Sequence, residues 1–219
     1  MSEADDQTLA TLQLLVEPVR RSLYRHVVAA APAEVGRDAA AEAVGVSRSL
    51  AAFHLDKLVE AGLLAVSYRR LSGRSGPGAG RPAKLYRRAE GEHALSVPPR
   101  GYAAAARLLA EVADQAGLEP QLQAAARRAG AAAGESLPAG AEIVDALAER
   151  GYEPRRQGAE IRLRNCPFHA LAREFPPLVC GMNLALLGGL LGESSGWQAR
   201  MDPRPGECCV VLDSKMNRA

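Results

Sequence analysis

The chain has few aromatic residues, no long apolar run and almost no net charge. Phe, Trp and Tyr make up 4% of its 219 residues, whereas hydrophobic residues, mostly alanine and leucine, make up 47%. This balance favours helices over sheets rich in aromatic and β-branched residues. No apolar stretch reaches the roughly 20 residues of a membrane-spanning helix, so we expect no membrane partner. The acidic first residues do not resemble a signal peptide, and we expect a cytoplasmic protein.

Patterns typical of enzymes are also missing. The sequence contains no phosphate-binding glycine loop, no paired carboxylates and no nucleophile with a base at a recognisable spacing. We therefore expect a binding protein and not an enzyme.

The net charge is only +2, but the basic residues are unevenly distributed. Residues 67–88 contain seven basic residues and no acidic one. Such a local basic stripe predicts contact with phosphates, although a solvated loop would have the same composition.

The first 90 residues show an ordered series of helix and strand signals. We predict a helix over residues 9–30 with a break near Glu17, because Pro18 lies inside the pattern. A short helix over 37–44 follows, and then a helix from the N-cap Ser47 to about residue 61, which Gly62 ends. Strands over 63–71 and 83–88 flank a glycine-rich tip at 72–82. This is the order of a winged helix-turn-helix DNA-binding domain.

In such a domain the last helix enters the major groove and the basic hairpin contacts phosphates or the minor groove. The residues expected to contact DNA are Ser47, Arg48, Ser49, Ala52, His54, Lys57, Arg69, Arg70, Arg74, Arg81 and Lys84. His54 is expected at a phosphate, at a base or at the rim of the interface, and not as a metal ligand.

Two segments carry a resemblance to a known group of regulators. Residues 46–64 contain Ser-x-x-x-x-x-x-His-Leu-x-x-Leu-x-x-Ala-Gly-Leu, and residues 80–86 read Gly-Arg-Pro-Ala-Lys-Leu-Tyr. Over residues 9–90 the chain resembles the ArsR/MarR-like winged-helix transcriptional regulators.

After a linker at 91–101, residues 102–219 are predicted to form a domain of mixed α+β structure, so that the whole chain is mainly α. Helices are expected over 102–117, 120–133 and 141–150, a hairpin over 152–156 and 160–164, and strands over 198–201 and 208–212. The first two helices can supply either the core of the domain or the interface of a homodimer, since winged-helix regulators bind palindromic DNA as paired subunits.

All four cysteines lie in this second domain, at positions 166, 180, 208 and 209. They lack the tandem C-x-x-C spacing of a zinc ribbon, but in a reducing compartment their grouping favours a metal or redox site over disulfides. Cys166 is expected at the N-cap of a helix that Pro167 begins, with His169 one turn on, and Cys180 at the start of a helix over 181–192. Adjacent Cys208 and Cys209 are expected in a strand, where one joins the site and Cys209 packs in the core.

Three further motifs carry a second resemblance. They are Asn-Cys-Pro-Phe-x-x-Leu-Ala from Asn165, Leu-Val-Cys-Gly-Met-Asn from Leu178 and Asp-Pro-Arg-Pro-Gly-x-Cys-Cys from Asp202. They are similar to the C-terminal half of the Suf-operon repressor-like family, whose members bind an iron–sulfur cluster. The resemblance implies a repressor that binds a 2Fe-2S or 4Fe-4S cluster through three cysteines.

The cluster ligands that the motifs imply are Cys166, Cys180 and Cys208, with His169 as the candidate fourth ligand. Three sulfurs and one nitrogen would also suit zinc, so a zinc-binding regulator with the same ligands stays open. Two more interpretations of the cysteines stay open as well. One is a thiol-based redox regulator with a Cys166–Cys180 disulfide, and the other is four buried cysteines without metal, since free cysteine packs well in cores.

Overall fold

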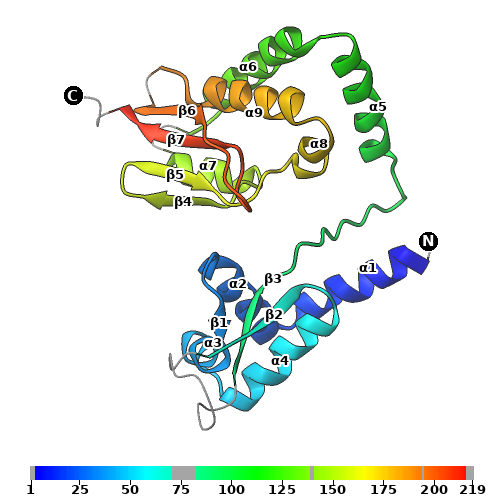
Figure 1. The fold of residues 1–219 in the computed structure, drawn as a ribbon, viewed down its shortest axis with the longest axis vertical. Coiled ribbons are helices and arrows are strands. Elements are labelled where there is room, and N and C mark those ends of the chain that lie inside the picture. The colour runs from blue at the N-terminus through cyan, green and yellow to red at the C-terminus, as the bar shows by residue number, and fades with distance from the viewer. Residues whose placement is uncertain (1–2, 71–81, 139–140, 194, 216–219) are drawn as a thin grey trace. The chain divides into compact units, whose positions relative to one another are not determined.

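The chain divides into two compact units, residues 1–100 and 101–219 (Figure 1). The computed structural model describes residues 3–70, 82–138, 141–193 and 195–215. Unit 1 contains the expected winged-helix elements, and unit 2 combines helices with a four-stranded sheet. None of the described helices is long and apolar enough to cross a membrane.

The helices of unit 1 follow the local signals of the sequence. They are α1 (Glu3–Gln13), the short 3-10 helix η1 (Leu14–Val16), α2 (Pro18–Ala30), α3 (Arg37–Val44) and α4 (Arg48–Glu60). The predicted break near Glu17 is confirmed. Pro18 is the first residue of α2, and the Glu17 carboxylate accepts hydrogen bonds from the backbone N–H groups of Val19 (3.1 Å) and Arg20 (2.6 Å). Glu17 thus satisfies two N–H groups that a helix start leaves free.

The wing of unit 1 consists of β2 (Leu64–Arg69) and β3 (Ala83–Arg88), which pair antiparallel with Val66 opposite Tyr86. A short strand, β1 (Val35–Gly36), pairs with the other edge of β3 and gives the order β1-β3-β2. The glycine-rich tip predicted between the two wing strands lies outside the described residues, apart from Pro82. Leu23, Val27, Leu55, Leu58 and Tyr86 form the centre of the core.

Unit 2 begins with α5 (Tyr102–Gln115) and α6 (Glu119–Glu135) and continues with α7 (Ile143–Glu149), α8 (His169–Glu174) and α9 (Pro176–Leu191). Its strands are β4 (Pro154–Gln157), β5 (Glu160–Leu163), β6 (Trp197–Met201) and β7 (Val210–Ser214), in the antiparallel order β4-β5-β7-β6. Apolar side chains of α9, such as Leu187 and Leu190, share a core with Ile161 and Leu212 of the sheet.

Helices α6 and α9 pack backbone against backbone (Figure 1). Gly130 and Gly134 of α6 face the chain of α9 so closely that a Cβ at Gly134 would lie 2.6 Å from the carbonyl oxygen of Leu190. From the other side, a Cβ at Gly189 would lie 2.9 Å from the backbone nitrogen of Ala131 and closer still to the carbonyl oxygen of Arg127. Only glycine permits this approach, and the contact holds α9 in place beside α6.

Candidate functional site

The start of α4 is shaped by a turn and a cap. Gly45 adopts a left-handed conformation (φ 72°) that ends α3, and the Ser47 hydroxyl accepts a hydrogen bond from the backbone N–H of Leu50 at 3.2 Å. This is the predicted N-cap. It leaves Arg48 and Ser49 exposed in the first turn of the helix.

Most of the residues predicted to contact DNA from α4 are accessible. Ser47, Arg48, Ser49 and Lys57 are exposed, and Ala52 is half-buried. Arg48 pairs with Asp38 at 2.6 Å, and Lys57 with Glu60 at 2.7 Å. Such surface pairs contribute roughly 0–1 kcal/mol, so both cations can exchange these partners for phosphates.

His54 differs from the prediction. Its ring is buried, with 7% of the residue exposed, and Nδ1 accepts a hydrogen bond from Arg20 Nε at 3.3 Å. Its Nε2 lies 3.7 Å from a Glu17 carboxylate oxygen. His54 therefore links α4 to the capped start of α2 inside unit 1, and its ring does not lie on the exposed face of α4.

The wing presents only part of the predicted set. Arg69 and Arg70 are exposed, whereas Lys84 is half-buried and donates to the carboxylate of Asp56 at 2.7 Å. Arg74 and Arg81 lie outside the described residues.

Asp56 is the centre of a polar network that joins α3, α4 and β3. Tyr86 donates its hydroxyl to Asp56 at 2.6 Å, and Arg37 donates to both the Tyr86 oxygen (2.9 Å) and Asp56 (3.2 Å). Burial opposes ionisation of Asp56, but the hydrogen bonds from Lys84 and Tyr86 lower the pKa of the carboxyl below its usual value. Burial and the bond to Asp56 raise the pKa of Tyr86 to about 12. The network fixes the wing strand against α4.

Comparison with known proteins agrees with this geometry. A family model described as a helix-turn-helix domain matches residues 15–67, from η1 to β2. Residues 15–67 form a helix-turn-helix domain. The match indicates a DNA-binding regulator. No curated protein and no solved structure matches the chain.

In unit 2 the four cysteines converge from three separate segments. Cys166 precedes α8, Cys180 lies within α9, and Cys208 and Cys209 end the loop before β7. Their thiols lie close enough to affect one another's pKa: Cys208 interacts with Cys166 and Cys209, and Cys209 also interacts with Cys180. All four are free thiols. We call these residues the four-cysteine group.

The group favours a thiolate at one position. Hydrogen bonds from Cys166 and Cys209 lower the pKa of Cys208 against the opposing effect of burial, and the backbone N–H of Val210 and the amide of Asn183 act in the same direction. The bond to Cys208, together with burial, raises the pKa values of Cys166 and Cys209. Among Cys166, Cys208 and Cys209, the thiolate is therefore favoured at Cys208.

A buried polar pair supports the Cys208 sulfur. Asn183, fully buried in α9, donates from Nδ2 to Cys208 Sγ at 3.3 Å. Its Oδ1 accepts a hydrogen bond of 2.5 Å from the hydroxyl of buried Tyr152. Tyr152 thereby fixes the orientation of the Asn183 amide, so that an N–H group points at the sulfur.

Arg162 contacts the loop that precedes Cys208 and Cys209. The guanidinium of Arg162, buried in β5, donates to the backbone oxygen of Asp202 at 3.3 Å and forms an ion pair with the Asp202 carboxylate. It also lies 3.8 Å from the Glu207 carboxylate. Arg162 therefore ties both ends of the segment 202–207 to the sheet.

The local structure around the cysteines differs from the prediction in three places. Helix α8 begins at His169, so Cys166 is not its N-cap; instead its carbonyl accepts a hydrogen bond from the His169 N–H at 3.0 Å. Helix α9 begins at Pro176, so Cys180 lies inside the helix and not at its start. Strand β7 begins at Val210, and the alternation rule used for Cys208 and Cys209 does not apply to them.

The residues near the cysteine thiols also differ from the predicted set. Cys209 packs against the core of unit 2, as the sequence pattern predicts, but its thiol also interacts with Cys208 and Cys180. His169 is exposed, and no hydrogen bond or ion pair among the described residues joins its ring to a cysteine. The sequence prediction misses Asn183 and Tyr152, although Asn183 is a conspicuous polar residue in the apolar sequence of α9.

The donor chemistry of the group suits a soft metal centre. Thiolates are the ligands that iron–sulfur clusters and structural zinc prefer, and an amide N–H directed at one sulfur is a typical supporting interaction. Among the described residues, however, no three His, Cys, Asp or Glu side chains are already grouped around one point as a metal site. Metal binding would require the thiols to move closer to a common point and to release protons.

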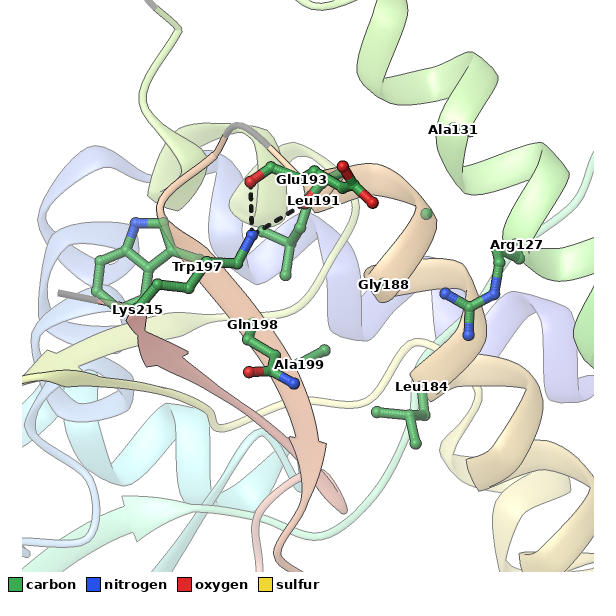
Figure 2. A pocket seen from close by; sticks show the side chains of 12 residues that line it. Arg127, Ala131, Leu184, Gly188, Leu191, Glu193, Trp197, Gln198, Ala199 and Lys215 are labelled. Atoms are coloured by element: carbon green, nitrogen blue, oxygen red, sulfur yellow. Dashed lines mark hydrogen bonds between the residues drawn. The ribbon is translucent and has the colours of Figure 1, made fainter. Parts of the chain in front are cut away.

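A separate hollow of about 640 Å³ lies between α6, α9 and β6 (Figure 2). Arg127, Leu184, Trp197 and Lys215 are among the residues that line it, and Lys215 Nζ donates to the backbone oxygen of Glu193 at 2.7 Å. None of the described lining residues is a cysteine. The hollow is therefore distinct from the four-cysteine group.

Proposed function

We propose that the chain is a transcriptional repressor that binds a palindromic DNA operator as a homodimer, under the control of an iron–sulfur cluster in unit 2. The observation that carries the proposal is the convergence of four thiols from three segments of a chain whose N-terminal unit is a helix-turn-helix domain. The resemblance of the cysteine motifs to the Suf-operon repressor-like family supports the cluster and the repressor role.

Contact with DNA is supported by the cations around α4. Arg48 and Lys57 on the helix and Arg69 and Arg70 at the end of the wing strand are exposed. We assign Arg48 to the groove and the others to phosphates, which position the domain without specifying sequence. Neutralising Lys57 by Lys57→Ala should weaken binding to all duplexes alike and reduce the dependence on salt.

A homodimer is supported by the apolar side of α5. Tyr102, Leu108, Leu109 and Val112 are all strongly exposed, with Leu109 at 72%. Large apolar side chains gathered on one helix mark an interaction surface, and a second copy of α5 is the partner that a palindromic operator requires. Leu109→Glu should convert the dimer to a monomer in sedimentation equilibrium.

Within unit 2 we assign the cluster to Cys166, Cys180 and Cys208, with Cys209 as the fourth ligand. The hydrogen bonds of Cys209 to two of the other cysteines favour it over the exposed ring of His169. A bound iron–sulfur cluster supplies a redox-active centre that oxidation can remove. Asn183 orients the Cys208 sulfur, and Arg162 keeps the loop of Cys208 and Cys209 on the sheet. Control of DNA binding requires that the cluster bind one DNA-binding state better than another.

The decisive experiment is purification of the full chain without oxygen. Visible absorbance, together with stoichiometric iron and acid-labile sulfide, is expected, and the affinity for an operator selected from random duplexes should change when the cluster is removed. Cys209→Ser should reduce the iron content, whereas the control His169→Ala should retain it. A wild-type protein without iron would refute the cluster, and full iron in Cys209→Ser would refute the assignment of the fourth ligand.

Zinc is the second candidate for the same group. Four thiolates form a ligand set common in structural zinc sites, so a colourless protein with one zinc per chain would favour this function. A redox regulator without metal is the remaining possibility. Its disulfide would appear in mass spectra of oxidised protein. The strong interaction between Cys166 and Cys208 favours a disulfide between these two residues over the Cys166–Cys180 disulfide suggested by the sequence.

A further inference from the structure

Two large apolar side chains stand on the exposed side of α4. Leu50 is 40% exposed and Phe53 is 55% exposed, whereas Leu55 and Leu58 of the same helix are fully buried. The core positions of the same helix are Ala51, Leu55 and Leu58. Because residues three apart lie on one side of a helix, Leu50 and Phe53 form a single apolar patch that the core of unit 1 does not use.

The patch lies among the groups expected to contact DNA. Ser49 adjoins Leu50 in the first turns, and Lys57 follows Phe53 one turn later on the exposed side. The Phe53 ring also meets the ring of buried His54 edge to face, with 5.3 Å between centroids. The buried histidine therefore restrains the aromatic ring while leaving more than half of the Phe53 residue open to a partner.

Apolar side chains have one specific partner in the major groove. Among the four bases only thymine presents a methyl group there, and contact with this methyl distinguishes thymine from cytosine without a hydrogen bond. Lys57 is assigned to a phosphate, which carries no sequence information. Besides Arg48, the apolar patch is therefore a part of α4 that can select bases.

We propose that Leu50 and Phe53 contact thymine methyl groups, so that the operator half-site contains thymine opposite the first two turns of α4. This inference rests on the proposed DNA-binding function and specifies the bases that the helix selects. It assigns Leu50 and Phe53 as specificity residues and Lys57 as a positioning residue.

The test replaces thymine by uracil, which pairs identically but lacks the methyl group. A duplex selected from a random library by the full chain is synthesised with single thymine-to-uracil replacements, and affinities are measured by fluorescence anisotropy. Loss of one buried methyl contact should weaken binding about fourfold, which corresponds to about 0.8 kcal/mol at 1.4 kcal/mol per tenfold change. At the thymine that Phe53 contacts, the Phe53→Ala variant should bind the thymine and uracil duplexes with equal affinity. The Leu50→Ala variant should do the same at the thymine that Leu50 contacts.

Two controls separate this inference from competing explanations. Tyr68→Ala removes an exposed aromatic residue from β2 and should keep the full effect of uracil. Phe53→Ala should leave the slope of affinity against salt unchanged, whereas loss of a phosphate contact reduces it. If the wild type binds DNA but no uracil replacement matters, or the effect persists in both alanine variants, the inference is wrong and DNA binding stands. If the wild type binds no duplex, the proposed function itself fails.

Discussion

The close contact between α6 and α9 predicts opposite effects on stability when one methyl group is added at either of two neighbouring glycines. Gly188 and Gly189 are neighbours in α9, but they face different surroundings. A Cβ at Gly189 would lie 2.9 Å from the backbone nitrogen of Ala131 and closer to the backbone of Arg127, neither of which can move alone. A Cβ at Gly188 would meet only the end of the flexible Arg127 side chain, at 3.3 Å (Figure 2).

The two substitutions should therefore have opposite signs. Replacing a helical glycine by alanine stabilises a helix by about 1 kcal/mol, and Gly188→Ala should gain up to this amount. Gly189→Ala gains the same, but its Cβ would overlap the carbonyl oxygen of Arg127, so the two helices must separate by roughly 1 Å. A gap of this size forfeits about half of the dispersion attraction across the contact. Overpacking of this kind costs about 1–3 kcal/mol or more, so we expect Gly189→Ala to destabilise unit 2 by about 2 kcal/mol.

The assay can follow unit 2 alone. Trp197 is the one tryptophan of the sequence and lies in β6, so its fluorescence during urea unfolding reports this unit. The midpoint should fall for Gly189→Ala and rise or stay unchanged for Gly188→Ala. Equal midpoints for the two variants, or a Gly189→Ala protein as stable as the wild type, would show that the helices are not in backbone contact.

Two further predictions concern the polar networks. Burial raises the folded pKa of Asp56, but the hydrogen bond from Lys84 and its other polar contacts lower it overall. The ionised carboxylate therefore stabilises unit 1 at pH values above its unfolded pKa of about 4. This stabilisation is lost as the pH falls through the lower folded pKa. Because water screens this partly exposed carboxylate, Asp56→Asn should cost only about 1 kcal/mol at pH 7 and little once the pH lies below the folded pKa of Asp56, as measured by circular dichroism. Asn183→Leu leaves the Tyr152 hydroxyl buried without its acceptor and should cost about 2 kcal/mol; adding Tyr152→Phe should recover part of this loss in the fluorescence assay.

The DNA-binding unit could be predicted closely because its signals are local. Ser47 and Gly62 mark the two ends of α4 through their own side chain and backbone, and Pro18 marks the start of α2. His54 could have been assigned to the core, since it lies three residues after Ala51 and next to Leu55 on the buried side. Strand β1 could not be anticipated, because two residues show no periodicity.

The cysteine site depends on contacts that are distant in sequence. Pro167 does not begin α8, which starts at His169, whereas Pro176 and Pro177 are the first two residues of α9, so that helix starts before the predicted Gly181. The pattern around Cys208 and Cys209 predicts a strand, but regular β7 begins only at Val210. The contacts of Arg162 with Asp202 and Glu207, at the two ends of the preceding loop, have no local signal in the sequence. Sequence patterns thus single out Cys166, Cys180 and Cys208 as candidates, but not the interaction of Cys209 with Cys180.

The separation of the cysteines along the chain has a thermodynamic consequence. Between Cys166 and Cys209 the chain contains α8, α9 and β6, which make up much of unit 2. Any group bound to both ends of this segment closes a long loop and removes conformational entropy from the unfolded state, as a disulfide does. Loss of that group would then raise the population of open forms of unit 2, and the change would be measurable as faster amide exchange in α9.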